Sequence, residues 1–143
     1  MTIDELKALN LGYLTGADLL QWCAAQFLIK QYEVDNNSLQ NGCDQAISEV
    51  IGAYTTRYNL SAELQKTGSA RATLLVKTLA ILAVRNVLGN MQSISDKMTA
   101  DFKWADTQVY MTRNGQINLP LPSASVFVAS TANLVCDSFK TLG

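Results

Sequence analysis

The chain has 143 residues, a length at which one domain can bury its own hydrophobic core without metals or disulfides. Its charged fraction of 16% is low against the usual quarter, and its net charge of −1 argues against a dedicated nucleic-acid binder. The sequence contains no histidine, which excludes serine–histidine and cysteine–histidine catalysis and removes the commonest metal ligand.

The cysteines and the most apolar stretch indicate the cellular setting. Cys23, Cys43 and Cys136 are odd in number and irregularly spaced, so a disulfide framework is not expected. We interpret Cys23 and Cys43 as buried free thiols of a protein assembled in a reducing cytoplasm. The N-terminus lacks the apolar segment of a signal peptide. Residues 72–88 are apolar but interrupted by polar side chains, which predicts a buried helix rather than a membrane span.

Two helices are predicted in the first half of the chain. The first follows a capping box formed by Thr15 and Asp18 and should extend over residues 16–32, where apolar residues recur on one face. The second should be capped by Ser38 and extend over residues 39–58, again with apolar residues at helical spacing.

The third predicted helix is the most apolar. The polar stretch 61–69 is interpreted as a loop with at most one helical turn, and Ser69 should cap a helix over residues 70–88. Because this helix is apolar on most sides, it should be central. Its main core row consists of Leu75, Leu79 and Leu82. Its polar residues should form a side that faces solvent or a partner, and they are Lys77, Thr78 and Arg85.

A fourth helix should begin at a capping box formed by Ser93 and Asp96 and end at Asn114 and Gly115. The pattern then changes, because prolines at 120 and 122 exclude both a helix and a central strand. The apolar residues of this last part alternate or form a short strand-like run, and they are Ile117, Leu119, Leu121, Val126, Phe127 and Val128.

The predicted fold class is therefore all-α. A bundle of about four main helices should occupy residues 1–115, followed by an extended, partly strand-like C-terminal arm, residues 116–143. An extended segment with two prolines buries too little by itself to repay its ordering entropy. We expect the arm to dock on a partner, and the alternative is that it folds back over its own bundle.

No motif for catalysis, metal binding or cofactor binding is found. Residues 35–46 lack the glycine and the glutamate that a calcium loop requires, and residues 68–71 lack the pattern of a phosphate loop. The chain is therefore not expected to be an enzyme or to bind a cofactor. Trp22 and Trp104 lie off the main apolar stripes of their helices, which makes them candidates for subunit contacts.

Two short signatures carry a resemblance to a known family. Tyr13, Thr15, Asp18 and Leu19 open the first predicted helix in the order Tyr-x-Thr-x-x-Asp-Leu. The second signature closes the next helix and consists of Tyr54, Arg57, Tyr58 and Leu60. Together with the apolar helix introduced by Arg71, they resemble the head-completion (head–tail connector) proteins of tailed bacteriophages, including the Mu-like branch, over about residues 13–115. Residues 61–63 depart from the family, which often has prolines there.

The resemblance implies a non-enzymatic subunit of a homo-oligomeric ring, docked on the portal and matching its twelvefold symmetry. Such a ring lines the DNA exit channel, lets DNA pass without sequence-specific binding and presents a platform for tail or neck proteins. It implies a location in the virion neck, assembly in the host cytoplasm and no membrane partner. The arm and the two tryptophans would then contact the portal or a neighbouring subunit. Two alternatives stay open: another phage neck or tail-terminator subunit, and a soluble helical regulatory module that binds one protein.

Overall fold

The structure is a computed structural model that describes residues 1–89 and 95–121. These residues form a mostly helical fold, so the predicted all-α class is confirmed. In chain order the elements are α1 (Ile3–Lys7), β1 (Asn10–Leu11), β2 (Leu14–Thr15), α2 (Gly16–Leu20), α3 (Ala25–Val34), α4 (Ser38–Tyr54), α5 (Leu60–Glu63), the 3-10 turn η1 (Gly68–Ala70), α6 (Thr73–Leu88) and α7 (Asp96–Arg113). No helix within these residues is long and apolar enough to cross a membrane.

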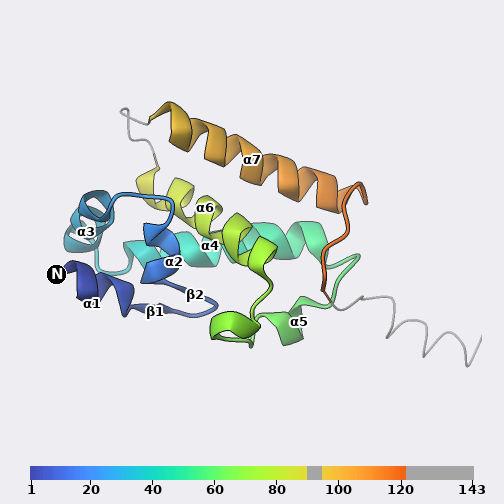
Figure 1. Cartoon of the computed structure of the whole chain (residues 1–143), viewed down its shortest axis with the longest axis horizontal. Helices are drawn as coiled ribbons and strands as arrows, with labels where there is room; N and C mark the ends of the chain where they lie inside the picture. The colour runs from blue at the N-terminus through green and yellow to red at the C-terminus, as the bar shows by residue number, and fades with distance from the viewer. Residues whose placement is uncertain (90–94, 122–143) are drawn as a thin grey trace, which may run out of the picture.

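The long helices α4, α6 and α7 form the body of the bundle (Figure 1). Helix α6 packs mainly on α4, and α7 lies across both. The short elements α1, α2 and α3 gather at one end with the β1–β2 hairpin. The approach of α4 to α6 is close at Gly42, where a Cβ atom would lie 2.5 Å from Val87 Cγ2. A small residue is therefore required at this helix crossing.

Helix α6 is the centre of the core, as predicted from its composition. Leu75, Leu79 and Leu82 are buried, so the predicted core row is confirmed. Thr78 was expected on a wet side with Lys77 and Arg85, and this is wrong because Thr78 is only 1% exposed. Its hydroxyl donates to the Leu74 carbonyl at 2.9 Å. This bond to the preceding turn satisfies the hydroxyl, so threonine is tolerated in the core.

The first predicted helix is broken in two. The capping box of Thr15 and Asp18 is confirmed, but α2 ends at Leu20 and α3 begins at Ala25. Leu19 and Leu28 are both fully buried. Nine residues apart at 3.6 residues per turn, they would lie on opposite sides of one straight helix. The turn between α2 and α3 lets both side chains reach the same core.

The N-terminal hairpin and α1 were not predicted. Helix α1 has its own capping box, in which Thr2 Oγ1 accepts from the Glu5 backbone N–H and Glu5 accepts from the Thr2 backbone N–H. The two strands pair in antiparallel register, Asn10 with Thr15 and Leu11 with Leu14. Both Leu11 and Leu14 are buried, so the hairpin closes this end of the core.

Several helix ends differ from the predicted positions. Asn37, not Ser38, is the N-cap of α4, and the Ser38 hydroxyl is buried without a hydrogen-bond partner among the described residues. Ala72, not Ser69, is the N-cap of α6. In α7 the Oγ of Ser95 caps the helix by accepting from the Met98 backbone N–H, so the cap follows the predicted Ser93 by two residues.

The region after α4 also differs from its prediction. Helix α4 ends at Tyr54, and Tyr58 lies beyond a turn, where its ring packs on that of Tyr54 in a T-shaped arrangement with 6.2 Å between the centroids. Asn59 does not close α4 but caps α5, accepting from the Ser61 backbone N–H. The predicted stop after the fourth helix is confirmed, since α7 ends at Arg113 and Gly115 adopts a φ of +76°.

Candidate functional site

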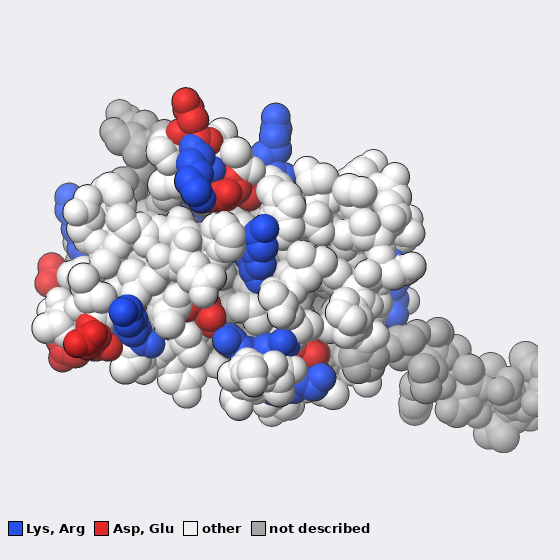
Figure 2. Space-filling model, viewed as in Figure 1, with Lys and Arg blue, Asp and Glu red and all other residues white. Residues whose placement is uncertain are grey.

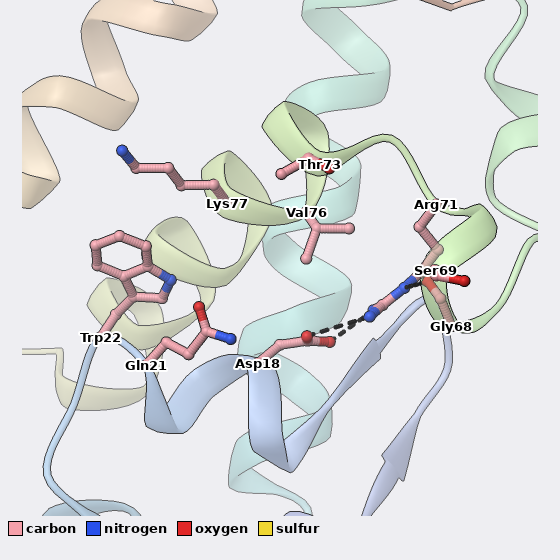
Figure 3. A pocket seen from close by; sticks show the side chains of 9 residues that line it. All are labelled: Asp18, Gln21, Trp22, Gly68, Ser69, Arg71, Thr73, Val76 and Lys77. Atoms are coloured by element: carbon pink, nitrogen blue, oxygen red, sulfur yellow. Dashed lines mark hydrogen bonds and ion pairs between the residues drawn. The ribbon is translucent and has the colours of Figure 1, made fainter.

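A pocket of about 360 Å³ opens between α2, η1 and α6 (Figure 3). Its lining combines charged, polar and aromatic side chains and consists of Asp18, Gln21, Trp22, Gly68, Ser69, Arg71, Thr73, Val76 and Lys77. Arg71 and Asp18 meet at one end of the pocket, while Trp22 and Lys77 lie at the other. Three of these lining residues are charged, namely Asp18, Arg71 and Lys77.

Arg71 is bound on all sides by the chain itself. Its guanidinium donates to both carboxylate oxygens of Asp18, at 2.6 and 3.2 Å, and to the carbonyls of Tyr13 and Gly68, each at 2.8 Å. Burial alone would raise the pKa of the Asp18 carboxyl, but hydrogen bonds from Arg71 and Thr15 outweigh it and hold that pKa below its ordinary value. This bidentate pair fastens α2 and the hairpin to the start of α6.

A second carboxylate, Glu63, is buried beside this pair. Its carboxylate accepts hydrogen bonds from the Tyr13 hydroxyl and, at 2.7 Å, from the Ala72 backbone N–H. It also forms an ion pair with Lys66 at 3.1 Å. Burial opposes ionisation, yet these three donors lower the pKa of Glu63 below its ordinary value. Burial, together with the hydrogen bond to Glu63, raises the pKa of the Tyr13 hydroxyl above its ordinary value. Glu63 therefore ties α5 to the hairpin and to the beginning of α6.

Acid should weaken these links. Because the pKa of Glu63 is lowered in the folded state, its stabilising contribution is present above the ordinary glutamate value of 4.5 and is lost as pH falls through the folded pKa. Glu63→Gln should reduce the free energy of unfolding at neutral pH by about 1–3 kcal/mol, because a neutral amide cannot replace the buried carboxylate as an acceptor of three bonds. Below about pH 4.5 the free energy of unfolding should also decrease less in the variant than in the wild type.

The measurement is urea denaturation of both proteins between about pH 3 and pH 7. Glu33→Gln is the matched control, because the Glu33 side chain is 62% exposed and its ion pair with the N-terminal ammonium, at 3.9 Å, is screened by solvent, so this variant should retain the wild-type acid profile. An acid profile of Glu63→Gln identical to that of the wild type would contradict the role given to this carboxylate.

Lys77 lies between the two tryptophans. Its Nζ is 4.0 Å from the ring centroid of Trp104 on α7 and 5.3 Å from that of Trp22, in the turn after α2. Lys97 Nζ is 5.4 Å from the Trp22 ring. Both rings are half-buried and pack against the core. The structure thus brings the two predicted contact residues together around one cation, and their contact with another subunit stays a prediction.

Arg57 and Tyr58 hold the segment that follows α7. The Arg57 guanidinium donates to the carbonyls of Thr112 and Ile117, at 3.0 and 3.1 Å, and to Asn118 Oδ1 at 2.8 Å. The Tyr58 hydroxyl accepts from the Leu119 backbone N–H at 2.9 Å, and this bond is buried. Two residues of the second signature therefore anchor the chain beyond Gly115 to the end of α4.

This anchor corrects the expected start of the C-terminal arm. Leu119 is a member of the hydrophobic core, Leu121 packs against the core half-buried, and Ile117 is half-buried. The expectation that Leu119 docks on a partner is therefore wrong, while a partner contact of Ile117 and Leu121 stays a prediction. The reason is the pair of hydrogen-bond anchors, which compensates the cost of ordering an extended segment. Val126, Phe127, Val128 and Cys136 lie outside the described residues.

Removing the Tyr58 hydroxyl should release this segment. Tyr58→Phe leaves the buried Leu119 N–H without its acceptor, which should cost about 1–3 kcal/mol. We expect faster amide hydrogen exchange at Leu119 and Leu121, with the amides of α6 unchanged. Tyr110→Phe is the control, because Tyr110 is 60% exposed and its loss should change neither. Unchanged exchange at Leu119 in the Tyr58 variant would contradict the anchor.

The remaining residues that the sequence singled out are buried in the core. Cys23 and Cys43 are buried free thiols, as predicted, and burial raises their pKa values to about 11 and about 12. Tyr54 and Leu60 of the second signature are core residues. Among the described residues, no group of three or more histidine, cysteine or acidic side chains is arranged to hold a metal.

Two sets of contacts between elements, those of Glu63 and those of Arg85, were not predicted from the sequence. Glu63 lies in a polar stretch that was interpreted as a loop, and the sequence carries no local signal of its burial. Arg85 is held between Glu49 and Asp106, at 2.7 and 2.5 Å, and so joins α4, α6 and α7. The spacing of Glu49 and Arg85 on the predicted helices leaves such a pair possible but does not single it out.

Comparisons with protein-family models, with curated proteins and with solved structures give no match for this chain.

Proposed function

We propose that this chain is a structural subunit of the head-completion (head–tail connector) ring of a tailed bacteriophage. In this proposal the ring is homo-oligomeric, docks on the portal with its twelvefold symmetry, and joins the DNA exit channel to tail or neck proteins. It is assembled in the host cytoplasm and resides in the virion neck. The role is architectural and involves neither catalysis nor a cofactor.

One observation carries the proposal. The residues through which the sequence resembles this family make the links between its elements. Thr15 and Asp18 fix the start of α2, Arg71 ties that start to α6, and Arg57 with Tyr58 fixes the segment after α7. The second signature is distant in sequence from that segment, so Arg57 and Tyr58 do more than end a local helix. A tertiary role of this kind is what we expect of residues that define a family, and it supports the proposal.

The charge distribution is consistent with the proposal. On the face drawn in Figure 2, charged side chains of both signs lie singly or in small mixed groups, with broad uncharged areas between them. A channel subunit should let DNA pass, and a continuous basic face would hold the phosphates instead. Uncharged surface is also what a ring subunit needs, because each copy meets neighbours on two different faces.

Sedimentation of the purified full-length chain tests the proposal. The chain should be measured over a range of concentrations, alone and with the portal protein encoded in the same genome. We expect a closed oligomer, either by itself or once the portal is present. A chain that remains monomeric in both conditions would contradict the proposal. A monomer that instead forms a one-to-one complex with a single non-virion protein would favour a regulatory module.

A further inference from the structure

A second pocket lies at the opposite side of the bundle from α3, between the end of α4 and α5. It has a volume of about 380 Å³ and is lined by Ile51, Thr55, Tyr58, Asn59, Leu60, Ser61 and Leu64. We call this the α4–α5 groove. None of its lining residues is charged, and Ile51 is one of the few large apolar side chains exposed on the described surface, at 39%. Such a groove fits an uncharged, apolar ligand.

The chain itself carries a segment of that chemistry. From Asn114 to Cys136 the sequence contains no charged residue, and Val126, Phe127 and Val128 form its most apolar run. The described part of this stretch descends past the end of α4 toward α5 (Figure 1). It is fastened there by the bond from the Leu119 N–H to Tyr58, which also lines the groove. The arm therefore starts beside the kind of groove that its own residues would fill.

We infer that the α4–α5 groove of one copy receives Val126, Phe127 and Val128 of a second copy of the chain. The inference rests on the proposed ring and names the contact that builds it. An extended segment can seat alternate side chains in such a groove while its backbone bonds to polar groups at the rim. Thr55 and Ser61 provide hydroxyls there. Because groove and arm are different surfaces of one chain, the contact is heterologous and can close into a ring.

The prolines favour a second copy over the arm's own groove. Each fixes its own φ, and Pro122 disfavours a helical conformation at Leu121, so the sequence favours an extended continuation. A return into the adjacent groove would require a reverse turn within residues 123–125, whereas an extended continuation requires none. Phe127 follows Leu121 by six residues and can lie up to about 20 Å from it, which is enough to reach a neighbouring copy.

Two full-length variants with complementary defects test this contact. Phe127→Asp places a charge in the arm and leaves the groove intact, while Ile51→Asp places a charge in the groove and leaves the arm intact. For each variant alone, the dissociation constant of self-association should be larger than that of the wild type by a factor of at least about ten, because the contact would bury an unpaired carboxylate. Mixed together, they should form a one-to-one pair through the one intact arm and the one intact groove. Sedimentation gives the stoichiometry.

The controls add the same charge elsewhere. Val34→Asp changes a side chain that is 76% exposed on α3, and Thr131→Asp changes the arm outside the apolar run. Both should assemble like the wild type. Circular dichroism of Ile51→Asp should match the wild type, since Ile51 is on the surface.

Two results would overturn the inference while leaving the proposed ring intact. In the first, both variants form oligomers like those of the wild type. In the second, each variant is impaired but the mixture gives no pair, so the impairment would not come from an arm–groove contact between two copies. A wild-type chain that stays monomeric even with the portal would overturn the proposed function itself and the inference with it.

Discussion

Replacing Gly16 with alanine should lower the free energy of unfolding by about 3 kcal/mol, at the upper end of the cost of overpacking. Gly16 is the first residue of α2, and a Cβ atom there would lie 1.7 Å from the Leu6 carbonyl oxygen and 2.8 Å from its carbon. These are backbone atoms, so α1 would have to move as a unit away from the hairpin. Urea denaturation at neutral pH measures the loss.

Gly52→Ala is the matched control, because Gly52 lies inside α4 with nothing within 4 Å of its added Cβ atom. Alanine is the better helix former, so this change should stabilise the protein by about 0.5–1 kcal/mol. The same substitution is thus expected to have opposite signs at the two sites. A Gly16 variant as stable as the wild type would show that α1 does not pack against α2 as described.

Leu79→Ala should cost about 2–5 kcal/mol. Leu79 is fully buried in the middle of α6, the helix that packs on both α4 and α7. The cost combines the lost burial of the side chain with the cavity that remains. Chemical denaturation monitored by circular dichroism gives the difference.

Val34→Ala removes a comparable apolar side chain that is 76% exposed, and it should change stability by less than about 0.5 kcal/mol. If Leu79→Ala fell within that same small range, α6 would be peripheral and the description of the core would be wrong.

The parts of the fold that were predictable are those with local causes. The capping box of Thr15 and Asp18 was identified correctly because all its atoms lie within four residues. The central role of α6 followed from its nearly continuous apolar composition. The break after Leu20 was missed because it arises from the demand that Leu19 and Leu28 face one core, which is a tertiary requirement. Thr78 was misplaced for a different reason: its polar side chain suggested exposure, but its hydroxyl is satisfied within its own helix and can therefore be buried.

The site shows the same division. Arg57 and Tyr58 were identified as a signature, but their partners lie about 60 residues further along the chain, and only the packed bundle brings them together. The burial of Glu63 was equally hidden, because its three donors come from different segments. The hairpin was missed because its strands contain only two residues each. The capping box of Thr2 and Glu5 was visible in the sequence and would have revealed α1.

The most direct test of the proposed function is imaging of the full-length chain bound to the portal of the same genome by electron microscopy. The account predicts a ring coaxial with the portal, with twelve copies of the chain surrounding an open channel. Density for a single copy bound off the axis, or a portal without additional density at saturating concentrations of the chain, would contradict it.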